Sequence, residues 1–143
     1  MIDKKTILNI AWTQAIIATS GSLFLSLVLH WTPCVLCWYQ RILMYPLVLV
    51  IAAGILKEIE DIEYVVLPMT FVGLGISIYH NLLMYKIIPE STAPCTADAA
   101  CNIPYHFIWG FLTIPLLSFI AFTVITVCMF MYHFAKKKNL SIK

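Results

Sequence analysis

The sequence predicts an all-α integral membrane protein in which four helices cross the bilayer and form one bundle. The chain of 143 residues is 62% hydrophobic and 11% charged, with a mean hydropathy of +0.91. A soluble domain of this size cannot bury so much apolar surface, so the bilayer must solvate most of it. The apolar residues run continuously in four stretches, without the alternation that marks barrel strands, and this favours helices.

Each apolar stretch is near the ~20 residues that a helix needs to cross the hydrocarbon core. The first follows Lys4 and Lys5, is longer than the apolar part of a signal peptide and lacks a cleavage site after it, so we expect an uncleaved membrane helix. We find no repeat and no separate soluble region, and we expect residues 1–143 to form a single membrane domain. The expected helices cover residues 7–29, 37–56, 62–85 and 107–134.

Lysine and arginine residues gather at one side of these spans, with Arg41 and Lys86 as the exceptions. Because cytoplasmic loops carry an excess of Lys and Arg, the bias predicts that both termini and the loop between the second and third spans are cytoplasmic. The loops at residues 30–36 and 84–106 are then extracytoplasmic. The residues that set this orientation are Lys4, Lys5, Lys57, Lys136, Lys137, Lys138 and Lys143.

Four cysteines form two pairs at the outer side of the predicted bundle. Cys34 and Cys37, spaced C-V-L-C, open the second helix, where the positive end of the helix dipole favours a thiolate. Cys95 and Cys101 enclose five residues. A disulfide across so short a loop adds only ~2–2.5 kcal/mol to stability, which favours thiol–disulfide exchange over a purely structural bridge. The alternative is a membrane scaffold with two structural loop disulfides.

Other uses of the cysteines fit the pattern less well, and we expect no metal. An all-cysteine zinc site usually needs two closely spaced pairs, and the second pair here is too widely spaced. A c-type haem would need a histidine directly after Cys37, where Trp38 stands. Cys128 lies alone within the fourth span and is expected to pack as a small apolar side chain. A transporter is disfavoured because the spans carry almost no ionisable residues.

Arg41 and His80 are candidates for a binding site beside the first cysteine pair. Arg41 is the only arginine and lies four residues after Cys37, so both side chains project from one helix face. It could hold a thiolate or donate hydrogen bonds to an oxygen-bearing electron acceptor, or it could extend to the lipid headgroups. His80, in the outer part of the third span, either packs in the bundle interior or reaches the same pocket. Gln40 is expected to point to another face.

Three features occur together along the whole chain: four spans, C-V-L-C-W-Y-Q-R at the start of the second, and a second cysteine pair between the third and fourth. Together they resemble the DsbB family, and the short form resembles the BdbC disulfide bond formation proteins. The resemblance implies a bacterial plasma membrane enzyme that supports disulfide formation in exported proteins. Such an enzyme reoxidises an extracytoplasmic thioredoxin-fold thiol oxidase (DsbA- or BdbD-like) and passes the electrons to a membrane quinone, menaquinone or ubiquinone.

The resemblance also implies a role for each cysteine. The reduced partner would attack the disulfide at Cys95, and the electrons would pass from Cys95 and Cys101 to Cys34 and Cys37. Cys37 would then act as thiolate donor to the bound quinone, with Cys34 as its exchange partner. Longer members of the family have more residues between the loop cysteines than the five found here, so the loop of this chain departs from theirs.

Two further positions gain a cofactor-binding role from the same resemblance. The arginine that matches Arg41 sits beside the quinone head group, and the histidine that matches His80 lies near it. Both positions stand near the outer ends of their predicted spans, where a lipid-soluble acceptor and a water-side dithiol can meet.

Overall fold

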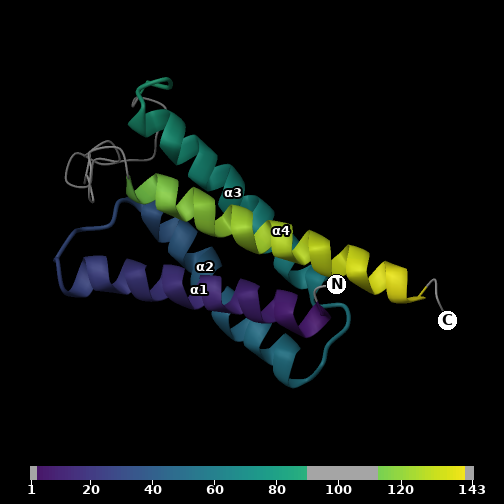
Figure 1. The fold of residues 1–143 in the computed structure, drawn as a ribbon. Coiled ribbons are helices and arrows are strands. Elements are labelled where there is room, and N and C mark those ends of the chain that lie inside the picture. Colours follow the sequence, from purple (N-terminus) through teal and green to yellow (C-terminus); the bar gives the residue numbers. More distant parts are fainter. Residues whose placement is uncertain (1–2, 90–112, 141–143) are drawn as a thin grey trace.

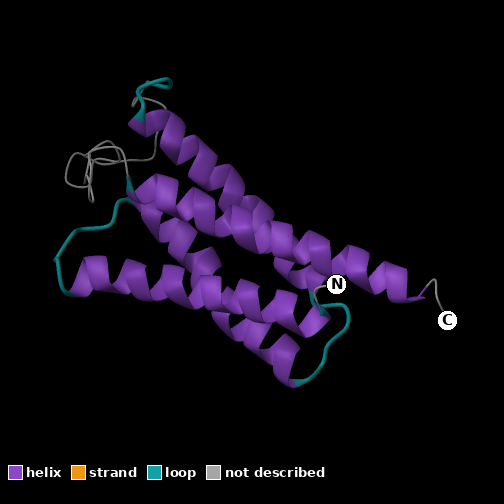
Figure 2. Ribbon diagram, viewed as in Figure 1, coloured by secondary structure: helices purple, strands orange, loops and turns teal. Residues whose placement is uncertain are grey.

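The computed structural model describes residues 3–89 and 113–140, and within them the chain forms four long helices (Figure 1). All four are long and apolar enough to cross a membrane, which confirms the predicted all-α membrane fold. Short loops join α1 to α2 and α2 to α3 (Figure 2). Cys95, Cys101 and residues 107–112 of the expected fourth helix lie outside the described residues. The helices are α1 (Lys4–Leu27), α2 (Val35–Leu56), α3 (Glu63–Met84) and α4 (Ile114–Leu140).

The helix boundaries differ from the predicted ones at polar positions. α1 begins at Lys4, before its apolar stretch, because lysine continues a helix readily and its charge can remain in water. α4 likewise runs beyond the expected end to Leu140. α2 begins two residues early, at Val35, because the Cys34 sulfur accepts a hydrogen bond from the backbone N–H of Cys37 at 3.4 Å and so caps the helix.

The helices form a closed ring of neighbours. Each packs against the next in sequence, and α1 closes the ring by packing against α4. Because the described loops are short, α1, α2 and α3 run alternately up and down (Figure 1). A buried apolar core fills the middle of the bundle, and its members include Ala11, Ala15, Leu47, Ile51, Val66, Phe122, Ile125, Cys128 and Met129.

One glycine sets the distance between α3 and α4. A Cβ atom at Gly73 would lie 2.3 Å from the ring of Phe122, which is far too close for two carbon atoms. The Phe122 ring, which is fully buried, therefore packs directly over the α3 backbone. Small residues of this kind allow membrane helices to approach closely, because lipid offers no hydrophobic force that would drive them together.

The topology brings distant segments together at each end of the bundle. The beginning of α2, the end of α3 and the beginning of α4 meet at one end (Figure 1). The beginning of α1, the loop from α2 to α3 and the end of α4 lie toward the other. The first end holds the C-V-L-C motif, and the second holds most of the lysines.

Candidate functional site

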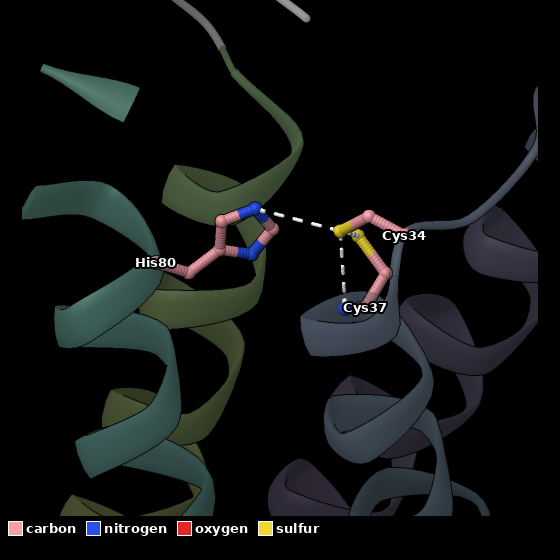
Figure 3. Close-up of side chains that lie close together, drawn as sticks. All are labelled: Cys34, Cys37 and His80. Carbon is pink, nitrogen blue, oxygen red and sulfur yellow. Dashed lines mark hydrogen bonds between the residues drawn. The ribbon is translucent and has the colours of Figure 1, made fainter. Parts of the chain in front are cut away.

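Cys34, Cys37 and His80 meet where α2 begins and α3 ends (Figure 3). The two cysteines are free thiols whose sulfur atoms lie 3.2 Å apart. The Nε2 atom of His80 lies 3.7 Å from the Cys34 sulfur. His80 is only 1% exposed and Cys34 only 7%, so the group is shielded from water. Of the two positions that the sequence allowed for His80, the structure therefore has the one at the cysteine pair.

The Cys34 sulfur is the place where this group best holds a negative charge. It forms a hydrogen bond with the Cys37 sulfur at 3.2 Å, lies 3.7 Å from Nε2 of His80, and accepts a hydrogen bond from the backbone N–H of Cys37 at the start of α2. These contacts, with the Cys37 thiol as the largest cause, outweigh the effect of burial and lower the pKa of Cys34 to about 4. Cys34 is therefore a thiolate at neutral pH when the pair is reduced.

The spacing of the sulfur atoms argues for a hydrogen-bonded group rather than a metal site. The two sulfurs and a ring nitrogen of His80 all lie within 4.8 Å of one another, as metal ligands could. Two thiolates on one tetrahedral zinc, however, stand about 3.8 Å apart at a Zn–S distance of ~2.3 Å. The observed 3.2 Å is shorter and suits a thiol that donates to a thiolate.

Arg41 turns toward α1 rather than toward the headgroups. Its Nη2 atom donates to the backbone carbonyl of Ser22 at 3.2 Å and to the hydroxyl of Ser26. Its guanidinium carbon also lies 5.6 Å from the centre of the Trp38 ring, within the range of a cation–π contact. These contacts fix a positive charge between α1 and α2, one helical turn from Cys37.

A cavity of about 330 Å³ joins these groups. Its wall is mostly apolar and comes from α1, α2, the end of α3, the beginning of α4 and the loop before α2. Gly21 lies in this wall, and a Cβ atom there would meet nothing within 4 Å, so the backbone of α1 borders open space. An apolar hollow of this size with a few convergent polar groups is typical of a small-molecule site. Its polar and titratable lining includes Ser22, Cys34, Cys37, Gln40, Arg41, Tyr45 and His80.

Gln40 belongs to the site, and the expectation that it points elsewhere is wrong. Its side chain is 5% exposed, lines the cavity, and places Nε2 3.4 Å from Nδ1 of His80. The sequence spacing already indicated this position. Helix positions i, i+3, i+4 and i+7 share one face, and here they are Cys37, Gln40, Arg41 and Met44.

Comparison with known proteins points to one family. The family described as disulfide bond formation protein DsbB matches residues 4–132. The disulfide bond formation protein C of Bacillus subtilis is 40% identical over 129 residues, which cover 90% of this chain and 94% of that protein. No solved structure matches the chain.

Two other relatives carry similar names. A probable disulfide formation protein of Oceanobacillus iheyensis is 41% identical over 126 residues, or 86% of each chain. Another from Deinococcus radiodurans is 40% identical over 134 residues, which cover 87% of this chain and 86% of that protein.

Proposed function

The chain belongs to the DsbB family of disulfide bond formation proteins, and from this premise we propose that it oxidises an extracytoplasmic thioredoxin-fold thiol oxidase and delivers the electrons to a membrane quinone. The observation that carries the proposal is the buried Cys34–Cys37 dithiol, which opens into an apolar cavity beside the Arg41 guanidinium. A dithiol that served only as a structural staple would have no use for a cavity at its sulfur atoms.

The cysteines supply the exchange chemistry. Formation of the disulfide from the Cys34 thiolate and the Cys37 thiol removes two electrons and one proton from the pair. A thiolate at Cys34 is a good leaving group and is ionised at neutral pH, because its pKa is low. Cys34 therefore suits the step in which the Cys34–Cys37 disulfide is exchanged for another disulfide, and Cys37 is the second sulfur of that pair. We propose that Cys95 and Cys101 exchange with this pair and receive the electrons of the partner.

The cavity fits a quinone head group by volume, polarity and charge. Its 330 Å³ suits a single ring, its apolar wall suits a lipid-soluble molecule, and Gly21 leaves room where another side chain would intrude. Arg41 offers charge-assisted hydrogen bonds to a ring oxygen, and His80 can carry a proton near the same wall. A bound quinone, menaquinone or ubiquinone, would supply the two-electron acceptor.

We further propose that the Cys34–Cys37 end of the bundle faces away from the cytoplasm in the bacterial plasma membrane. The support is the excess of lysine at the opposite end, including Lys5, Lys57 and Lys136. In this orientation a soluble thioredoxin-fold oxidase reaches the loop between α3 and α4 from the water side, while the cavity lies near the lipid side of the same dithiol.

The test uses purified full-length protein in detergent, a reduced thioredoxin-fold dithiol protein and a soluble quinone, with quinone absorbance as the signal. We expect quinone loss that requires both the partner and Cys37, so Cys37→Ala should be inactive. Cys128→Ala is the matched control, because Cys128 lies in the core away from the cavity, and it should retain activity. Turnover in Cys37→Ala, or none in folded wild-type protein with several quinones and partners, would leave the structural scaffold as the better account.

A further inference from the structure

Gln40 has no part in the chemistry described so far, yet it contacts the ring nitrogen of His80 that Cys34 does not use. The Gln40 amide nitrogen, Nε2, lies 3.4 Å from Nδ1 of His80, and Nε2 of the same ring lies 3.7 Å from the Cys34 sulfur. The chain therefore places an amide, an imidazole and a sulfur in one row that runs from α2 through α3 and back to the start of α2.

The hydrogen-bonding capacity of these groups decides where the ring proton lies. An amide nitrogen only donates, so Nδ1 must accept, and a neutral imidazole with an accepting Nδ1 carries its proton on Nε2. The Nε2–H group then points at the Cys34 sulfur and donates to it. With the other tautomer, Nε2 would present a lone pair to the sulfur and would no longer hold a negative charge there.

Because the site is buried, the tautomer of His80 strongly affects the charge on the Cys34 sulfur. Gln40 is 5% exposed and His80 only 1%, so water has little access to take over a lost contact. Similar tautomer control, through a hydrogen bond to the second ring nitrogen, governs histidines in catalytic and metal sites. A glutamine that merely filled space between α2 and α3 would not need its amide at the ring nitrogen.

We propose that Gln40 is a positioning residue that fixes the tautomer of His80, so that Nε2–H faces Cys34 and holds its thiolate. The inference rests on the proposed function only in treating Cys34 as a redox cysteine. Other titratable groups line the same cavity and must be kept unchanged in any test. None of them comes from α1 or from the described part of α4. They are Cys37, Arg41, Tyr45 and His80.

The test measures the thiolate itself in reduced, full-length protein without quinone or partner. Iodoacetamide alkylates Cys34 over a range of pH, and tandem mass spectrometry assigns the label. Because the pKa of wild-type Cys34 is about 4, its alkylation rate should reach half of its maximum near pH 4 and stay level above about pH 6, where the rate of an ordinary thiol still rises steeply. In Gln40→Met the midpoint should move upward by about one pH unit, because the ring is no longer held as a donor.

Two further variants separate positioning from packing. Gln40→Glu, which is nearly the same size, should also raise the midpoint, because a carboxylate only accepts and so draws the ring proton to Nδ1, which leaves the Nε2 lone pair facing Cys34. Gln14→Met makes the same change at another glutamine in the cavity wall and should leave the midpoint in place. An unchanged or lowered midpoint in Gln40→Met or in Gln40→Glu, or an equal shift in Gln14→Met, would overturn the proposal. A failure of quinone reduction would not affect this measurement, so the two proposals fail separately.

Discussion

The two ends of the bundle treat buried polar groups in opposite ways. At the cysteine end, formed by Cys34, Cys37 and His80, polar groups border a cavity. At the clasp end, formed by Glu63, His133 and Lys136, charged groups from α3 and α4 meet one another directly. The Glu63 carboxylate is fully buried, with Lys136 Nζ at 3.3 Å and His133 Nδ1 at 3.4 Å from the same oxygen.

The difference shows how one small bundle separates stability from chemistry. His80 and Glu63 stand on the same helix, roughly 25 Å apart at the ~1.5 Å rise per residue of an α-helix. At the clasp end the cation of α4 pairs with a fully buried carboxylate, so the ion pair holds the start of α3 against α4. At the cysteine end the Arg41 guanidinium rests on α1 beside open space, where a ligand can meet it.

The largest predicted effect is a loss of stability at the clasp end, and it tests whether that end of the bundle serves stability alone. Lys136→Met removes the cation of the buried Glu63 carboxylate and should lower the free energy of unfolding by about 3 kcal/mol. Unfolding in mixed micelles with increasing SDS measures the loss. Quinone reduction per folded molecule should stay unchanged. Lys137→Met removes the neighbouring lysine, which is exposed, and should change neither the free energy of unfolding nor quinone reduction. Equal losses in both variants would show that Lys136 acts only as a surface charge.

A second prediction concerns function at the cysteine end. Arg41→Met should lower kcat/KM for quinone by about 10- to 100-fold, because a charge-assisted hydrogen bond contributes ~1.5–3 kcal/mol. Arg41→Lys should recover only part of the loss, since lysine keeps the charge but not the planar fork. Steady-state kinetics over a range of quinone concentrations gives both values. Wild-type kcat/KM in Arg41→Met would contradict a binding role for the guanidinium.

The smallest predicted effect comes from filling the cavity. Gly21→Leu should weaken quinone use by about tenfold, because the side chain would enter the hollow that α1 borders. Gly75→Leu is a close match: a Cβ atom there also meets nothing within 4 Å, and the change in helix propensity is the same, but Gly75 does not line the cavity. Equal kinetics in the two variants would place the quinone elsewhere.

The sequence predicted the parts of this molecule that depend on local patterns. Continuous apolar stretches gave the four spans, and the i, i+4 spacing placed Arg41 on the face of Cys37. Contacts between helices could not be predicted in this way, because helix rotation is set by packing. Gln40 was therefore assigned to the wrong face, and the pairing of Arg41 with Ser22 and Ser26 was not foreseen.

The start of α2 shows how a small boundary error changes the chemistry. The sequence predicts that the helix starts at Cys37 and that its positive end favours a thiolate in the Cys34–Cys37 pair, with no choice made between the two sulfurs by the dipole. With the helix starting at Val35, Cys34 becomes the cap, and the backbone N–H of Cys37 points at the Cys34 sulfur. Two residues thus decide which sulfur carries the charge in the reduced pair. The resemblance still assigns Cys37 the quinone, and that role stays a prediction.

The cap at the start of α2 also has a mechanical consequence. Helices usually begin on an oxygen of Ser, Thr, Asp or Asn, whose capacity to accept a hydrogen bond is constant. Here the first turn begins on a sulfur atom that, in the redox cycle we propose, would be a thiolate in the reduced pair and part of a neutral disulfide in the oxidised pair. A neutral sulfur is a weaker acceptor. The hydrogen bond from the backbone N–H of Cys37 to Cys34 would therefore be stronger in the reduced pair and weaker in the oxidised pair. The next turn of α2 carries Gln40 and Arg41. The start of the helix would therefore respond to the oxidation state of the cysteine pair that it carries.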